Sequence, residues 1–240
     1  YGLVGSEMCI RDSSVADILT GKVNPSGKLT MTWPIAATDH PSTANFAKEY
    51  DMYTYKNMEG WGKGNIPGVD FSNHEEDIYV GYRYFDTFKK DVAYPFGFGL
   101  SYTTFEMGKP SVKTNGKNIE VSVTIKNTGK VAGKQVAQVY VTAPKGAYEK
   151  PAKELKAFGK TRELKPGESQ TLKMTLEKRD LASFDEANSQ WKVDAGNYLF
   201  QVGTDVESIK GTATLKVAEY AEKTSRACAP NVQLNYLKQK

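Results

Sequence analysis

Short runs of alternating apolar and polar residues, divided by turn residues, fill the second half of this 240-residue chain. The clearest run occupies residues 119–126, where every second side chain is Ile or Val, and an Asn-Thr-Gly turn ends it. Further candidate strands occupy residues 136–142, 154–158, 172–176, 196–202 and 215–217. Short strands separated by turns are typical of a sandwich or a barrel. The sequence therefore predicts a mainly β fold with an immunoglobulin-like sandwich over residues 107–219, close to the usual ~100 residues.

An aromatic-rich stretch, YPFGFGLSYTTFE at residues 94–106, precedes most of these strands. Pro95 fixes one backbone angle, and Gly97 and Gly99 permit backbone conformations that other residues avoid. This composition is typical of a closely packed connector whose rings are wedged between two bodies. The rings expected to make these contacts are Tyr94, Phe96, Phe98, Tyr102 and Phe105.

Residues 13–93 are predicted to be the last edge of a larger α/β unit. Two serines suited to a helix N-cap come before apolar residues at helical spacing, and a glycine follows as a stop signal. After an Asn-Pro-Ser-Gly turn, Leu29, Met31 and Trp33 alternate with polar residues, as in a half-buried strand. One helix, one turn and one strand cannot close a core by themselves. The body of this unit is therefore expected to lie upstream.

The two ends of the chain are expected to lie outside these units. Residues 1–12 resemble translated adaptor sequence, and we exclude them from the fold as a non-native segment. Residues 220–240 are polar and are expected to form an extended tail. The two cysteines, Cys9 and Cys228, both lie in these ends, so the sequence predicts no disulfide framework.

Three residues are candidates for contact with a sugar. Residues 35–76 form a long irregular stretch, which is either a surface excursion or, in a sharper interpretation, a border that places Trp61 beside a sugar. Tyr82 and Arg83 follow in an aromatic segment. We expect Arg83 to make a structural ion pair or a cation–π contact, and a direct substrate role is the second interpretation.

Composition excludes several classes of function. The net charge is only +4, and its 32 basic residues are spread among 28 acidic ones, so we expect no nucleic-acid partner. No apolar run approaches the ~20 residues needed to span a bilayer. His40 and His74 are isolated from other ligands at metal-site spacing. We therefore expect neither a metal site nor a cofactor.

Several stretches resemble glycoside hydrolase family 3. ADILTGKVNPSGKLTMTWP is similar to the closing segment of its α/β sandwich domain, and EEDIYVGYRYFDTF with the aromatic connector is similar to the segment that follows. VTIKNTGKVAGKQVAQVYV, KELKAFGKTRELKPGESQTL and AGNYLFQVGTD resemble the fibronectin type III-like domain that ends many members. The order and the spacing of these stretches agree as well as the motifs. The resemblance implies the C-terminal portion of a β-glucosidase, and β-xylosidases share the layout.

The resemblance implies that catalysis resides elsewhere in the protein. Family members are retaining glycosidases with an Asp nucleophile on a barrel and a Glu acid/base, and both precede Ala16 in the family's order. No residue here is carried over as catalytic. The run Glu75, Glu76 and Asp77 does not replace the pair, because adjacent residues of a strand point to opposite faces. We expect this chain to be structural and inactive alone, with β-linked glucosides reaching the intact enzyme in the periplasm or outside the cell.

A non-catalytic binding module is the alternative. Such a sandwich would bind carbohydrate or a surface partner through a row of exposed aromatic side chains. Most rings after residue 105 fall at alternating strand positions, which indicates a core. Tyr148 and Trp191 do not, and they are the candidates for such a surface.

Overall fold

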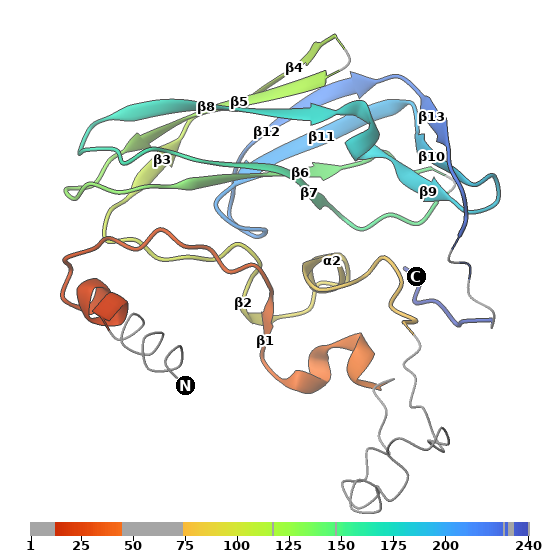
Figure 1. Cartoon of the computed structure of the whole chain (residues 1–240), viewed down its shortest axis with the longest axis horizontal. Coiled ribbons are helices and arrows are strands. Elements are labelled where there is room, and N and C mark those ends of the chain that lie inside the picture. The colour runs from red at the N-terminus through yellow and green to blue at the C-terminus, as the bar shows by residue number, and fades with distance from the viewer. Residues whose placement is uncertain are drawn as a thin grey trace, which may run out of the picture.

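The computed structural model describes residues 13–44, 74–116, 118–146, 148–227, 229 and 233–239. Two four-stranded sheets pack against each other to form the larger part of the molecule. A smaller N-terminal segment, residues 13–44 and 74–93, lies along one side of this sandwich (Figure 1). The mainly β fold predicted from the sequence is confirmed.

One sheet of the sandwich is built around its longest strand, β5. Antiparallel β8 pairs along one edge of β5, while β3 and β4 pair in succession along the other. The four strands are β3 (Phe105–Met107), β4 (Ser111–Asn115), β5 (Asn118–Asn127) and β8 (Ser169–Glu177).

The second sheet has the order β12-β11-β6-β7, and all of its pairs are antiparallel. Central β6 is buried at its five middle residues, as its continuous apolar run predicts. The strands are β6 (Val136–Thr142), β7 (Glu154–Lys160), β11 (Gly196–Gly203) and β12 (Ile209–Val217). The strands predicted from the sequence are thus confirmed.

The core between the two sheets follows the alternation in the sequence. Every second residue of β5 points inward and is at most 2 % exposed. Inward side chains of β8 and β11 meet them, and each buried aliphatic side chain contributes about 1.5–3 kcal/mol relative to an exposed one. The side chains at the centre of this core are Ile119, Val121, Val123, Ile125, Leu172, Met174, Leu176, Tyr198, Phe200 and Val202.

A third, smaller sheet lies at one end of the sandwich and was not expected from the sequence. It has the order β13-β10-β9, with β9 at Ser183–Asp185, β10 at Gln190–Val193 and β13 at Tyr220–Lys223. A 3-10 helix, η4 (Lys178–Leu181), leads into it. The segment expected to be an extended tail therefore begins with a strand, because antiparallel pairing with β10 satisfies its backbone groups.

The N-terminal segment contains short elements joined by irregular chain. Residues 13–19 are helical, as expected. The other elements are β1 (Trp33–Pro34), η1 (Ala37–Asp39), η2 (Pro41–Ala44), α2 (Tyr82–Thr87) and β2 (Val92–Tyr94). None of the helices in the described ranges is long and apolar enough to cross a membrane.

The strand predicted from Leu29 to Trp33 is wrong in extent and in the face it buries. Only Trp33 belongs to a strand, and Met31 and Trp33 are 61 % and 51 % exposed while Thr32 is buried. The backbone of Leu29 bonds instead to the connector, through Phe98 O and Gly97 N at 2.8 Å each. With this pairing the Thr32 side chain points inward. Within the described residues, no element covers the face that carries Met31 and Trp33.

Residues 233–239 return to the N-terminal segment. Leu237 N–H donates to the Glu75 carbonyl at 2.7 Å. The Gln239 amide donates to the Tyr79 hydroxyl at 3.0 Å and to the Lys150 carbonyl at 2.7 Å. This C-terminal strap therefore bridges the N-terminal segment and the sandwich (Figure 1).

The turn between β7 and β8 contains an ion pair that makes a testable electrostatic prediction. Both Glu168 oxygens accept from Arg162 at 3.0 Å, and Lys165 N–H adds a bond at 2.9 Å. These bonds favour the carboxylate and lower the pKa of Glu168 to about 2. Arg162→Gln is expected to raise this pKa toward its ordinary value of 4.5, measured by NMR titration of the Glu168 carboxyl.

The sign of the effect on stability follows from the depressed pKa. Because the folded pKa lies below the unfolded one, the pair stabilises the fold above pH ~4.5, and this contribution is lost as the pH falls toward 2. Glu163→Gln, next to Arg162 in the chain, is the control and should leave the Glu168 titration unchanged. An unaltered Glu168 pKa in the Arg162 variant would show that the pair is absent in solution.

Candidate functional site

The aromatic connector contacts the N-terminal segment through two tyrosines. The Tyr94 ring meets Trp33 edge-on at 6.3 Å and lies 5.1 Å from Phe98. The Tyr102 hydroxyl donates to the Ile18 carbonyl at 2.8 Å. Both tyrosines are nonetheless about half exposed, so part of each ring remains accessible.

On its other side the connector meets the sandwich. The Phe96 ring lies 4.6 Å from Tyr82, whose ring in turn meets Tyr140 edge-on at 6.1 Å. Gly97 has φ +85°, a conformation that favours glycine, and its carbonyl accepts from the buried Gln138 amide at 3.2 Å. The connector is therefore joined to the β6 strand by stacked rings and by a buried amide.

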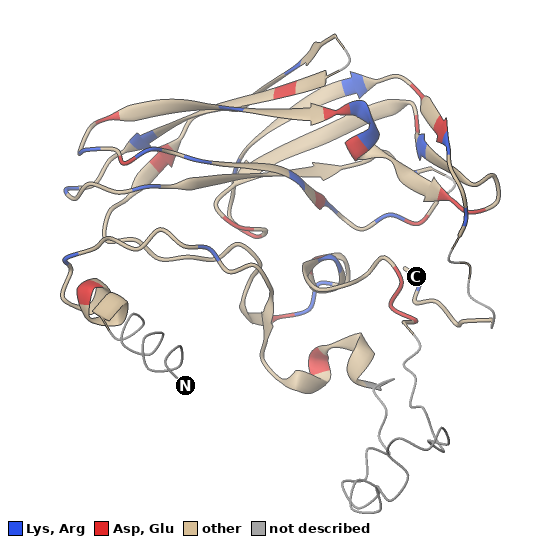
Figure 2. Cartoon of the chain, in the orientation of Figure 1, with Lys and Arg blue, Asp and Glu red and all other residues tan. Residues whose placement is uncertain are grey.

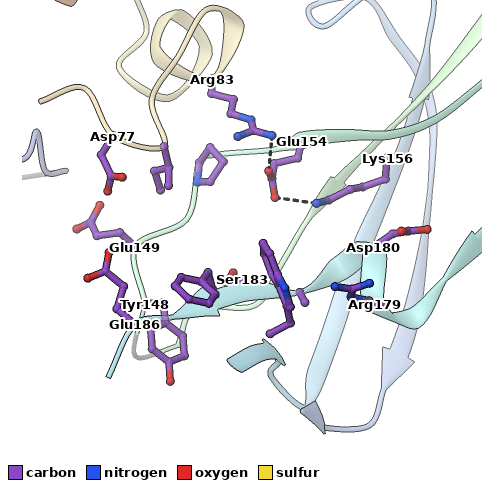
Figure 3. A pocket seen from close by; sticks show the side chains of 15 residues that line it. Asp77, Arg83, Tyr148, Glu149, Glu154, Lys156, Arg179, Asp180, Ser183 and Glu186 are labelled. Carbon is purple, nitrogen blue, oxygen red and sulfur yellow. Dashed lines mark ion pairs between the residues drawn. The ribbon is translucent and has the colours of Figure 1, made fainter. Parts of the chain in front are cut away.

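A groove of about 760 Å³ lies between the N-terminal segment and one end of the sandwich. Residues before and within α2 form part of its rim, and the loop before β7, β7 itself, η4 and the third sheet supply the rest. Figure 3 draws the lining side chains and labels the charged ones together with Tyr148 and Ser183. The lining residues are Asp77, Ile78, Arg83, Tyr148, Glu149, Pro151, Glu154, Lys156, Arg179, Asp180, Ala182, Ser183, Phe184, Glu186 and Trp191.

One side of the groove is a charged wall of three residues, Arg83, Glu154 and Lys156. Arg83 Nη2 lies 2.9 Å from one oxygen of Glu154, and Lys156 Nζ lies 3.1 Å from the other (Figure 3). The ion pair expected for Arg83 is present. It joins α2 to β7, and hence the N-terminal segment to the sandwich.

Three carboxylates stand at one end of the groove. Asp77, Glu149 and Glu186 lie close together in Figure 3. The buried Tyr79 hydroxyl donates to Glu149, and Arg226 pairs with Glu186 at 2.7 Å. Burial and the negative charge of Glu186 raise the pKa of Asp77. Two of the three carboxylates are therefore held by partners.

Three aromatic side chains also line the groove, and we call Tyr148, Phe184 and Trp191 its aromatic wall. Figure 3 shows Tyr148 on the side opposite Arg83 and Glu154. Phe184 lies on β9 and Trp191 on β10, directly paired in register, with ring centroids 5.3 Å apart. The Arg179 guanidinium stands 5.8 Å from the Trp191 ring centroid. Interaction with the Asp185 carboxylate raises the pKa of Tyr148. Phe184 and Trp191 are held by strand pairing, and all three rings are only partly buried.

Of the three residues that the sequence suggested for contact with a sugar, one lies in the groove. Arg83 lines the groove, whereas Tyr82 does not, because its ring packs on Phe96 and its hydroxyl accepts from Leu155 N–H at 2.8 Å. Trp61 lies outside the described residues. Their roles toward substrate remain predictions.

Tyr148 and Trp191, singled out from the sequence as exceptions to the core pattern, meet in this groove. Phe184 and Arg179 were missed. They belong to strands and a 3-10 helix of three or four residues, too short to show alternation. One signal for them was available in the sequence. The number of residues between Phe184 and Trp191 fits two short strands joined by a turn, in which the two rings would be paired.

The arrangement is suited to binding rather than to bond cleavage. Glu154 is neutralised by two cations, and Glu149 accepts a hydroxyl hydrogen bond. In the described part of the chain, no group of three or more His, Cys, Asp or Glu side chains is placed to hold a metal ion. Charges of both signs are interspersed along the strands in Figure 2.

Two family models match the chain. Residues 10–102 match the glycosyl hydrolase family 3 C-terminal domain, and residues 135–206 match the fibronectin type III-like domain. The two matches fall on either side of the end of the connector. They therefore agree with the division into an N-terminal segment and a sandwich.

Curated relatives and solved structures give the same result. The chain is 41 % identical over 207 residues to a β-glucosidase from Kluyveromyces marxianus and 39 % identical over 227 residues to one from Ruminococcus albus. These alignments cover 85 % and 91 % of this chain but only 22 % of each relative. A solved structure of β-glucosidase 3B from Thermotoga neapolitana in complex with glucose superposes with a TM-score of 0.74 and 45 % identity, over 88 % of this chain and 27 % of that one.

The chain thus spans about a quarter of the length of the enzymes that it matches. Both the sequence and the fold agree over nearly all of the described residues. The chain belongs to glycosyl hydrolase family 3 and corresponds to the C-terminal part of its β-glucosidases.

Proposed function

We propose that this chain is the C-terminal portion of a retaining β-glucosidase, which hydrolyses terminal non-reducing β-D-glucosyl residues. The observation that carries the proposal is the 45 % identity to an enzyme named β-glucosidase that was solved with glucose bound. A second relative solved with glucose, from Kluyveromyces marxianus, is 39 % identical. The nucleophile and the acid/base are assigned to the part of the enzyme that precedes this chain.

The role of the chain within the enzyme is structural in this proposal. Residues 13–93 complete the α/β domain, residues 94–106 connect it, residues 107–219 form the fibronectin type III-like domain, and the rest is a C-terminal extension. Half-exposed Tyr94 and Tyr102 support this role, since they leave aromatic surface of the connector accessible to another part of the enzyme. The connector would then hold the sandwich against the catalytic body.

A transplant experiment tests the proposal. The purified 240-residue chain alone is expected to release no aryl alcohol from an aryl β-glucoside. A chimera in which residues 13–240 replace the matching part of the Thermotoga neapolitana enzyme is expected to hydrolyse it, whereas the same enzyme cut before this part should not. Hydrolysis by the chain alone, or an inactive but soluble chimera, would refute the structural role.

A β-xylosidase is the other enzyme that the family layout allows. To distinguish the two, the gene is extended upstream of this chain, and the whole enzyme that it encodes is expressed and assayed on both substrates. A preference for an aryl β-glucoside over an aryl β-xyloside supports the proposal, and the reverse preference supports the alternative.

A further inference from the structure

The groove between the charged wall and the aromatic wall has the features of a ligand site. Its volume of about 760 Å³ falls within the ~300–1,000 Å³ typical of small-molecule sites. It combines half-buried rings with polar side chains, and Figure 3 shows Arg83 and Glu154 on the side opposite Tyr148. Apolar ring faces with a few fixed polar groups are the usual lining of such sites.

Several charged side chains of the groove already have partners of opposite charge. Glu154 is flanked by Arg83 and Lys156, and Glu186 is paired with Arg226. A ligand with a net charge would have to displace these partners. A neutral ligand with many hydroxyls would instead use their remaining capacity, because a guanidinium carries five N–H donors and a carboxylate has about four acceptor sites.

The aromatic wall favours a ligand with apolar faces. Phe184 and Trp191 are held by the pairing of β9 with β10. Rings that are already ordered lose little conformational freedom when a ligand stacks on them. Pyranose rings combine a face of C–H groups, which can stack on the aromatic wall, with a rim of neutral hydroxyls, which can hydrogen-bond to the charged wall.

We propose that this groove binds a neutral oligosaccharide, stacked on Trp191 and Tyr148 and hydrogen-bonded by Arg83, Glu154 and Lys156. The choice of a β-linked gluco-oligosaccharide as its ligand rests on the proposed function. The walls come from both the N-terminal segment and the sandwich, so binding requires the two parts in their present arrangement.

The test uses the full chain and cellotetraose, followed by isothermal titration calorimetry. Saturable binding is expected, and Trp191→Ala is expected to weaken it about tenfold or more, because stacking and burial of an aromatic ring are lost. Phe158→Ala is the matched control, since Phe158 is a strand aromatic that is 70 % exposed outside the groove. It should bind as the unaltered chain does.

A second measurement does not depend on removing the groove residue. In a Trp33→Phe, Trp61→Phe double variant, Trp191 is the sole remaining tryptophan of three. Its fluorescence should change saturably with cellotetraose, at the affinity measured by calorimetry. Absence of saturable binding, or binding unaffected in a folded Trp191→Ala variant, would overturn the proposal.

The result of the cellotetraose binding test is independent of the result of the transplant experiment. If the chimera hydrolyses the aryl β-glucoside and the chain does not bind cellotetraose, only the groove proposal fails. If the chain binds cellotetraose and a soluble chimera is inactive, only the structural role given under the proposed function fails.

Discussion

Gly97→Ala is expected to lower the free energy of unfolding by about 3–5 kcal/mol, one of the two largest effects that we predict. Gly97 has φ +85°, which disfavours any L side chain. An added Cβ would stand 2.2 Å from Gln138 Oε1 and 2.5 Å from its Nε2. Urea unfolding of the full chain, followed by circular dichroism, measures the loss.

The cost is high because Gln138 has nowhere to move. It is 3 % exposed, and its amide donates to the Thr204 carbonyl at 2.7 Å and to the Gly97 carbonyl. Its oxygen accepts from the buried Tyr140 hydroxyl at 2.6 Å. Displacing it would leave several buried polar groups without partners, each at about 1–3 kcal/mol.

Gly167→Ala separates the backbone cost from the clash. Gly167 has φ +81° but nothing within 4 Å of the Cβ position. The free energy of unfolding of this variant should fall by only about 1–2 kcal/mol, which is the penalty for an L side chain in a left-handed backbone conformation. Equal losses in the two variants would mean that Gln138 repacks freely, contrary to the present account.

Asn127→Ala is expected to cost about 3–5 kcal/mol, because it removes the centre of a buried hydrogen-bond network. Asn127 is fully buried, and its amide donates to the carbonyls of Val131 and Leu164 at 2.8 Å each. Its oxygen accepts from the Thr103 hydroxyl at 2.8 Å and from Gly129 N–H at 3.0 Å. One side chain thus ties the end of β5 to the connector and to two loops.

Asn118→Ala is the matched control, since Asn118 is an exposed asparagine at the other end of the same strand. It should change the free energy of unfolding by no more than about 0.5 kcal/mol. Asn127→Asp adds a pH signature, because its carboxylate would face two carbonyl oxygens. This variant should be less stable at neutral pH than at acidic pH, where the carboxyl is protonated. Comparable stability of Asn127→Ala and Asn118→Ala in urea would disprove the role of the network.

The sandwich was predictable because its strands obey a local rule. In residues 119–125 apolar and polar side chains alternate, so the sequence itself indicates which face of the strand is buried. The N-terminal segment does not obey this rule. Leu29, Met31 and Trp33 alternate, yet the chain pairs with the connector through its backbone and exposes two of the three. A pattern alone does not tell which partner takes the backbone hydrogen bonds.

The groove was predictable only in part for a related reason. Tyr148 and Trp191 were conspicuous because they broke the alternation of the sandwich. Their meeting with Arg83 depends on how α2 sits against β7, a contact between residues about 70 positions apart that propensity does not describe. Phe184 lies on a strand of three residues, which carries no period at all.

The C-terminal strap has a consequence for the order of events during synthesis. The hydrogen bond between Gln239 and Tyr79 joins residues 160 positions apart. Tyr79 is made long before its partner, and domains begin to fold from the N-terminal side as they emerge at ~5–20 residues per second. The sandwich can therefore condense on the growing polypeptide, whereas the N-terminal segment acquires this last tether only after residue 239 has been added.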